Sequence, residues 1–212
     1  MKILICDDHA VVRRGIKSLL LELTPRPDEI VEAATFGEAL GAVHERSFEL
    51  AVLDLNIPGG HGLDLLKEIK RLCPQTPVMI LTVHTEEEYA IRAMRAGAGA
   101  FLSKDADPTE LLLAARRLLA GGRYITPEVG DALATQLSRG DADRPAHEAL
   151  SDREFQVLRR LGSGRRVGEI SAELSLSPKT VSTYRTRLLD KLNLSTTAEI
   201  ARYALRHGLV DD

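Results

Sequence analysis

The first half of the chain alternates short apolar runs with longer segments in which apolar residues recur at helical spacing. Short apolar runs are typical of buried strands, and periodic segments are typical of amphipathic helices. The runs predict strands at residues 2–6, 29–34, 49–54, 77–82 and 98–103. The periodic segments predict helices at residues 11–23, 36–45, 63–72, 86–95 and 109–119.

This regular alternation predicts an α/β fold of five βα units, with a doubly wound parallel sheet and helices on both faces. Three of the predicted strands are almost continuously apolar, as strands covered on both faces should be.

The second half of the chain changes to a helical pattern, with helices predicted at residues 152–161, 167–174, 178–192 and 197–207. Ser151 with Glu154 forms a capping-box pattern, and Ser177 with Pro178 marks a further helix start. We therefore predict an α/β domain at residues 1–121, a linker at 122–147 and a small all-α domain at 148–212. The linker holds a predicted helix at residues 127–137, followed by a polar stretch from Ser138 to Pro145.

Composition adds three expectations. The chain has 212 residues and is 44% hydrophobic, with no apolar run near the roughly 20 residues that cross a bilayer. Its N-terminal segment is interpreted as a first strand and not a signal peptide, so a cytoplasmic protein without membrane contact is expected. Acidic residues are in excess up to residue 147 and basic residues within 153–191, which suggests a nucleic-acid partner for the second half.

Polar residues follow four of the five predicted strands. Asp7 and Asp8 follow the first, Asp54 ends the third, Thr82 ends the fourth and Lys104 follows the fifth. Singly, each could be a cap, a turn residue or a solvated charge. Together, three carboxylates at one edge would repel each other unless a cation such as Mg²⁺ intervened, and a hydroxyl and an ammonium suit an oxyanion. The set predicts a phosphoryl-transfer site.

The motifs CDDH, VLDLNIPGGHG, ILT and FLSKD, in this order, resemble the receiver domain of two-component response regulators over residues 1–120. The resemblance implies a flavodoxin-like strand order of 2-1-3-4-5. It implies that Asp54 accepts a phosphoryl group from a sensor histidine kinase, and that the domain catalyses only this step and a slow dephosphorylation. Implied ligands of Mg²⁺, or Mn²⁺, are Asp7 mostly through water, Asp8, Asp54 and the backbone carbonyl of Asn56.

The resemblance also implies that Thr82 and Lys104 hold the phosphoryl oxygens and that Phe101 is the switch aromatic, which turns inward on activation. Phe101 has no hydroxyl, unlike the tyrosine usual at this position. The glycine-rich loop from Gly59 to Gly62 carries His61, which we interpret as a solvent-exposed loop residue. The extra glycine in this loop has no explanation from the sequence.

Helices 167–174 and 178–192 have the spacing of a helix-turn-helix. In the second helix, Val181, Leu188 and Leu192 should face the core. The other faces carry hydroxyls and cations that suit DNA, although composition alone fits an ordinary surface helix equally well. These residues are Lys179, Ser182, Thr183, Tyr184, Arg185, Thr186 and Arg187.

Residues 148–210 resemble the four-helix LuxR/NarL-type DNA-binding domain. The resemblance implies that Ser182, Thr183 and Thr186 reach bases. It implies that the four remaining side chains mainly meet phosphates: Lys179, Tyr184, Arg185 and Arg187. The helix at 197–207 is the usual dimer contact.

The sequence is thus identified as a NarL/FixJ-type response regulator. Phosphorylation of Asp54 is expected to release or dimerise the C-terminal domain, so that a homodimer binds paired half-sites in double-stranded DNA. Two alternatives stay open at this point. One is an aspartate-dependent phosphatase or phosphotransferase, and the other is a DNA-binding receiver protein that never accepts phosphate.

Overall fold

The computed structural model describes residues 1–24, 26, 29–84, 87–138 and 145–210. Its contacts divide the chain into two compact units, Met1–Gln136 and Leu137–Asp212, whose boundary lies within the predicted linker. Glu86, most of the predicted polar stretch and the last two residues lie outside the described residues. Within the described part, no helix has the length and apolarity needed to cross a membrane.

The first unit is built on a five-stranded parallel sheet, as predicted. The strands lie in the order β2-β1-β3-β6-β7, which is 2-1-3-4-5 when the sheet's strands are counted along the chain. The predicted order is therefore confirmed. The bounds are β1 Ile3–Cys6, β2 Ile30–Ala33, β3 Leu50–Leu53, β6 Val78–Thr82 and β7 Ala100–Ser103.

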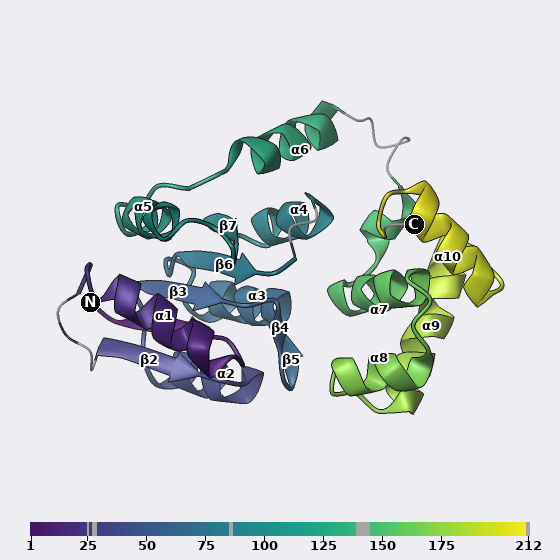
Figure 1. Ribbon diagram of the computed structural model, residues 1–212, viewed down its shortest axis with the longest axis horizontal. Helices are drawn as coiled ribbons and strands as arrows, with labels where there is room; N and C mark the ends of the chain where they lie inside the picture. The colour runs from purple at the N-terminus through teal and green to yellow at the C-terminus, as the bar shows by residue number, and fades with distance from the viewer. Residues whose placement is uncertain (25, 27–28, 85–86, 139–144, 211–212) are drawn as a thin grey trace. The chain divides into compact units, whose positions relative to one another are not determined.

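Five helices flank this sheet, namely α1 Ala10–Leu20, α2 Phe36–Glu45, α3 Gly62–Leu72, α4 Glu87–Arg95 and α5 Pro108–Leu119. Helices α1 and α5 cover one face, where their apolar side chains share a core with alternate strand residues such as Ile3 and Ile5. Helices α2, α3 and α4 lie side by side along the other face (Figure 1). Both faces are thus covered, as the apolar strands required.

Three local features differ from the prediction. Helix α1 ends at Leu20 and not at residue 23, because Leu21–Leu23 form turns ahead of two prolines in the sequence. A hairpin of strands β4 Asn56–Ile57 and β5 Gly60–His61 precedes α3, and a short 3₁₀ helix spans Ala146–Ala149. Elements this short show no periodicity, so the sequence pattern did not reveal them.

After α5 the chain continues along the edge of the sheet. Tyr124 forms a bridge to Ala100 of β7, and its hydroxyl donates to Glu110 of α5 at 3.0 Å. Helix α6, Pro127–Ser138, then follows, close to the predicted 127–137. The first residues after the α/β core are therefore held on it by backbone pairing.

The second unit is helical, with α7 Asp152–Gly162, α8 Val167–Glu173, α9 Pro178–Leu192 and α10 Thr197–Arg206. The predicted capping box of Ser151 and Glu154 is present, and Ser177 caps α9 with Pro178 at its first position. The core contains Phe155 of α7, Ile170 of α8 and Ile200 of α10. Val181, Leu188 and Leu192 of α9 are buried with them, as predicted.

Candidate functional sites in the two units

The parallel register brings the predicted polar residues of the first unit to one edge of the sheet. Cys6 of β1 pairs with Leu53 of β3, so Asp7 and Asp54 leave the neighbouring central strands side by side. Thr82 ends β6 on the other side of β3, and Lys104 follows β7. The structure therefore assembles the acids, the hydroxyl and the ammonium that the sequence separates.

Lys104 connects the two buried acids of this site. Its Nζ lies 2.6 Å from Asp7 Oδ2 and 2.7 Å from Asp54 Oδ2, and the Lys104 side chain is 9% exposed. Burial, the largest single influence, lowers the pKa of Lys104, but its hydrogen bonds to Asp54 and Asp7 and their charges outweigh burial. The pKa of Lys104 is therefore raised, so the ammonium stays charged and offsets the repulsion between the two carboxylates.

Asp54 is fixed by backbone contacts as well as by this ion pair. Its N–H donates to the Cys6 carbonyl at 2.8 Å, and its Oδ1 accepts from the Leu55 N–H at 2.6 Å. The residue is only 3% exposed. Next to it, burial followed by the charges of Asp7 and Asp54 raises the pKa of the Cys6 thiol to about 12, so Cys6 stays a neutral core residue.

The structure explains the glycines of the loop that follows Asp54. Gly59 has a φ of +81°, which favours glycine. A Cβ at Gly60 would lie 2.1 Å from the Phe36 ring, and one at Gly62 would lie 2.1 Å from the Asp54 carbonyl oxygen. The glycines therefore let the hairpin approach Phe36 of α2 and let the start of α3 approach Asp54 closely.

The interpretation of His61 as a solvent-exposed residue is wrong. His61 is 0% exposed and serves as the N-cap of α3, where its Nδ1 accepts from the Leu63 N–H at 3.3 Å. Its ring also lies 6.4 Å from that of Tyr89 in α4. The prediction failed because the hairpin that turns His61 inward has no signal in the sequence.

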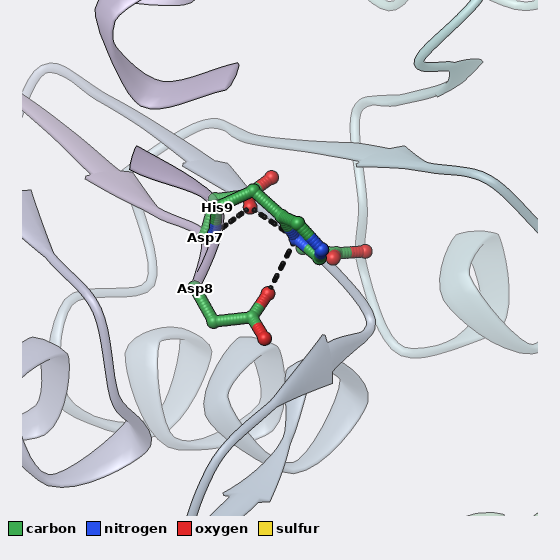
Figure 2. A group of neighbouring side chains, drawn as sticks. Asp7, Asp8 and His9 are labelled. Atoms are coloured by element: carbon green, nitrogen blue, oxygen red, sulfur yellow. Dashed lines mark hydrogen bonds and ion pairs between the residues drawn. The ribbon is translucent and has the colours of Figure 1, made fainter. Parts of the chain in front are cut away.

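Asp8 and His9 form the open side of the acidic site. His9 Nδ1 lies 2.7 Å from Asp8 Oδ1 and 3.3 Å from Asp7 Oδ1, and Figure 2 shows the ring turned back toward both carboxylates. Asp7, Asp8, His9 and Asp54 each offer a donor atom, and these atoms lie within 4.8 Å of one another. Carboxylate oxygens at this spacing fit a hard divalent cation. The sequence analysis did not assign His9, although it directly follows Asp8.

Of the remaining predicted residues, Thr82 and Asn56 lie around the same edge, whereas Phe101 lies within β7. Thr82 is buried, and its Oγ1 accepts from the His84 N–H at 3.3 Å. Asn56 Nδ2 lies 2.8 Å from His84 Nε2, a contact that the sequence did not suggest. Phe101 is 5% exposed, so its ring is already turned inward in this structure.

Helix α9 carries the predicted DNA-contacting residues of the second unit. Most of them are exposed, whereas Tyr184 and Arg185 are half-buried. Thr183 and Thr186 each donate their hydroxyl to a backbone carbonyl one turn earlier in the helix. Arg185 Nε donates to Thr197 Oγ1 of α10 at 2.9 Å, so this guanidinium also holds two helices together. The exposed members are Lys179, Ser182, Thr183, Thr186 and Arg187.

Comparisons with known proteins follow this division into two units. The response regulator receiver domain family matches residues 3–116, and the luxR family of bacterial regulatory proteins matches residues 148–204. The chain is a LuxR-type response regulator. The family that the motifs indicated is thereby confirmed. The alternative of an aspartate-dependent phosphatase or phosphotransferase is set aside, because LuxR-type response regulators are DNA-binding transcription regulators.

This response regulator has relatives of nearly equal length. Response regulator UvrY of Escherichia coli (strain K12) is 35% identical over 210 residues, which are 99% of this chain and 95% of UvrY. Response regulator GacA of Pseudomonas aeruginosa is 35% identical over 212 residues, which are 100% of this chain and 98% of GacA. A structure of RcsB from Salmonella enterica serovar Typhimurium is 26% identical, with a TM-score of 0.60 over 96% of this chain and 98% of RcsB. Its DNA is the promoter rprA, and the phosphomimetic BeF₃⁻ is present.

Proposed function

We propose that Asp54 is the phosphoacceptor of this response regulator and that a sensor histidine kinase is the donor. The observation that carries the proposal is the buried contact of Asp54 with Lys104, beside Asp7. Backbone hydrogen bonds hold the Asp54 carboxylate in place. The Lys104 ammonium lies close enough to stabilise the negative charge that a phosphoryl group brings. Thr82, at the end of the neighbouring strand, can supply a hydroxyl to the same group.

In the proposed step, a carboxylate oxygen of Asp54 attacks the phosphorus of the phosphohistidine. The new P–O bond forms as the P–N bond breaks, and the kinase imidazole leaves with the electron pair and takes a proton from water. Lys104 offsets the negative charge that moves onto Asp54, and Asp7 keeps Lys104 in position.

The acidic edge fits the divalent cation that receiver domains generally bind. Asp8 and Asp54 would hold Mg²⁺ or Mn²⁺ directly, Asp7 mostly through water, and Asn56 through its backbone carbonyl. When bound, the cation supplies positive charge that offsets the repulsion between the incoming phosphoryl oxygens and the carboxylates.

For the output we propose domain limits of 1–121 and 148–212, joined by the segment 122–147. The charge added at Asp54 draws the Thr82 hydroxyl toward it, holds Phe101 inward and reshapes the face formed by α4, β7 and α5. The second domain is then released or dimerises through α10. The binding of RcsB to a promoter in the presence of a phosphomimetic supports DNA binding by the phosphorylated form.

In the DNA complex we propose that α9 lies in the major groove of each half-site, and that the homodimer reads two half-sites. Ser182, Thr183 and Thr186 reach base edges. The cations Lys179, Arg185 and Arg187, together with Tyr184, contact phosphates. Their location on one helix, mostly exposed, supports this assignment. No membrane partner is proposed, and the cytoplasm is the proposed location.

The test is incubation of the full chain with acetyl phosphate and Mg²⁺. We expect a single phosphorylation by intact mass and tighter binding to DNA selected from a random pool, both lost in Asp54→Asn. Asp105→Asn is the matched control, because Asp105 is an exposed carboxylate next to Lys104. Absence of phosphorylation with unchanged DNA affinity would support the alternative of a receiver that never accepts phosphate.

A further inference from the structure

His9 occupies an unusual place at the acidic edge. It is the N-cap residue of α1, a position that favours side chains able to cap the helix, yet the His9 side chain makes no capping hydrogen bond. Its backbone N–H instead donates to Asp7 Oδ1 at 2.8 Å, and this contact directs the ring toward the acids. Figure 2 shows both contacts from the imidazole and the one from the backbone.

The distance between Nδ1 and Asp8 Oδ1 matches that expected between neighbouring ligands of one metal ion. Ligands with bonds of about 2.1 Å at right angles lie about 3 Å apart. Nδ1 lies 2.7 Å from Asp8 Oδ1, which is proposed to bind the ion directly, and 3.3 Å from Asp7 Oδ1, which is proposed to act mostly through water. The His9 side chain is 65% exposed, so a hydrated ion can reach it from solvent.

An imidazole nitrogen changes the chemistry of an otherwise oxygen-based site. Mg²⁺ prefers oxygen ligands and gives up its water reluctantly, so it gains little from a nitrogen donor. Imidazole suits the later divalent transition metals, whose affinity for mixed nitrogen and oxygen sites rises along the first row. Among the described residues, this is the one group of three or more potential metal ligands, and His9 is its single nitrogen donor.

We propose that His9 Nδ1 is a direct metal ligand. With this ligand, the receiver binds ions that favour nitrogen donors, such as Co²⁺, Ni²⁺ and Zn²⁺, more tightly than its carboxylates alone would. A bound ion lies between the neutral ring and the acids and accepts the lone pair of Nδ1, while the single ring proton is carried on Nε2. His9 is thus a determinant of metal preference at the site where the proposed function places Mg²⁺, and the inference rests on that function.

The test compares Co²⁺ and Mg²⁺ binding to the metal-free full chain by titration calorimetry, with the visible spectrum of bound Co²⁺ as a second readout. His9→Asn replaces the nitrogen donor with an amide oxygen and retains a residue favoured at N-caps. We expect Co²⁺ affinity to fall by about tenfold or more, since even indirect partners of a metal contribute 10–100-fold. Mg²⁺ affinity should change less than about twofold, and the nitrogen contribution to the Co²⁺ spectrum should be lost.

His44→Asn is the matched control, because His44 is an exposed histidine on α2 of the same unit, outside the cluster. Its Co²⁺ affinity should equal that of the unchanged chain. An equal loss for both ions in His9→Asn, or no loss for Co²⁺, overturns the role of His9. If Mg²⁺ still binds and Asp54 is still phosphorylated, the proposed function stands without a metal-ligand role for His9. If neither ion binds the unchanged chain, both proposals fail.

Discussion

The two candidate sites of this response regulator are built in opposite ways. In the receiver, Asp7, Asp54 and Thr82 lie at the ends of separate strands, are almost fully buried and accept hydrogen bonds. On α9, the residues proposed to meet DNA follow one another in one helix and are mostly exposed. The receiver site therefore depends on the fold for its assembly, whereas the α9 surface depends on it only for a straight helix.

This difference indicates at which of the two sites function and stability are coupled. A buried charge without its partner is costly, so a change at the receiver edge should alter folding and phosphorylation together. An exposed side chain has water as a replacement partner, so a change at an exposed residue of α9 should alter DNA binding alone. The following predictions test whether this separation holds.

The largest expected effect is that of Lys104→Met. It leaves the buried Asp7 and Asp54 without their shared cation, and removal of one partner of a buried pair costs about 3–5 kcal/mol. Urea unfolding of the full chain should show this loss in the receiver transition, together with loss of Asp54 phosphorylation. The control is Lys67→Met, which removes an exposed charge of α3, and loss of a surface charge should cost less than about 1 kcal/mol. A loss below about 1 kcal/mol for Lys104→Met would mean that the carboxylates are solvated.

The same ion pair predicts a dependence on alkaline pH. The pKa of Lys104 is raised above its ordinary value of 10.5, so its contribution to stability is fully present below pH 10.5. The contribution is lost as pH rises through the folded pKa. The free energy of unfolding of the unchanged chain should therefore fall more steeply with pH in that range than that of Lys104→Met.

The next effect concerns backbone packing at Gly62. In Gly62→Ala the new Cβ would lie 2.1 Å from the Asp54 carbonyl oxygen, and overpacking of this kind costs about 1–3 kcal/mol. The displaced Asp54 should also be phosphorylated more slowly by acetyl phosphate. The control is Gly41→Ala, because Gly41 is on α2 and a Cβ there meets nothing within 4 Å, so a gain of about 0.4–1 kcal/mol is expected. Normal stability of Gly62→Ala would show that the start of α3 can move away.

The sequence predicted the sheet and the convergence of Asp54 with Lys104, because apolar runs and strand ends are visible in any parallel α/β pattern. The strand order was implied only by the resemblance to receiver domains, because apolar runs do not show which strands pair. It also predicted the buried face of α9. It missed the inward position of His61 and the contact of Asn56 with His84, since both depend on a hairpin of two-residue strands. The role of Gly62 was equally invisible, because it depends on which carbonyl oxygen lies beside it in space.

On α9, the pair Thr186→Ala and Leu188→Ala should separate binding from folding. Thr186 is exposed, so its loss should leave stability within about 0.5 kcal/mol but weaken binding to the preferred operator by about 1–3 kcal/mol. Leu188 is fully buried, and its truncation should cost about 2–5 kcal/mol of stability. Thermal unfolding and fluorescence anisotropy with operator and scrambled DNA measure the two effects. Equal loss of affinity for both DNAs in Thr186→Ala would assign this residue to phosphates.

The smallest expected effect tests whether the second unit also contains a coupled buried charge. Glu154 is almost fully buried in α7, and its Oε2 lies 2.7 Å from Nζ of Lys191 on α9. Burial, the largest influence, raises the pKa of Glu154, but the bonds from Lys191 and from Ser151 outweigh it, so the pKa is lowered from 4.5. The resulting stability is present above pH 4.5 and is lost as pH falls through the folded pKa.

Glu154→Gln keeps the capping box but removes the charge, and because Lys191 is partly exposed the cost should be about 1 kcal/mol or less. Acid titration of the unfolding midpoint should show a shallower decline in this variant than in the unchanged chain. DNA affinity should stay the same, since Glu154 is buried and its partner on α9, Lys191, is not among the proposed DNA-contacting residues. A change in operator preference would instead mean that this ion pair sets the position of the helix, and that the second unit couples folding to function as the receiver does.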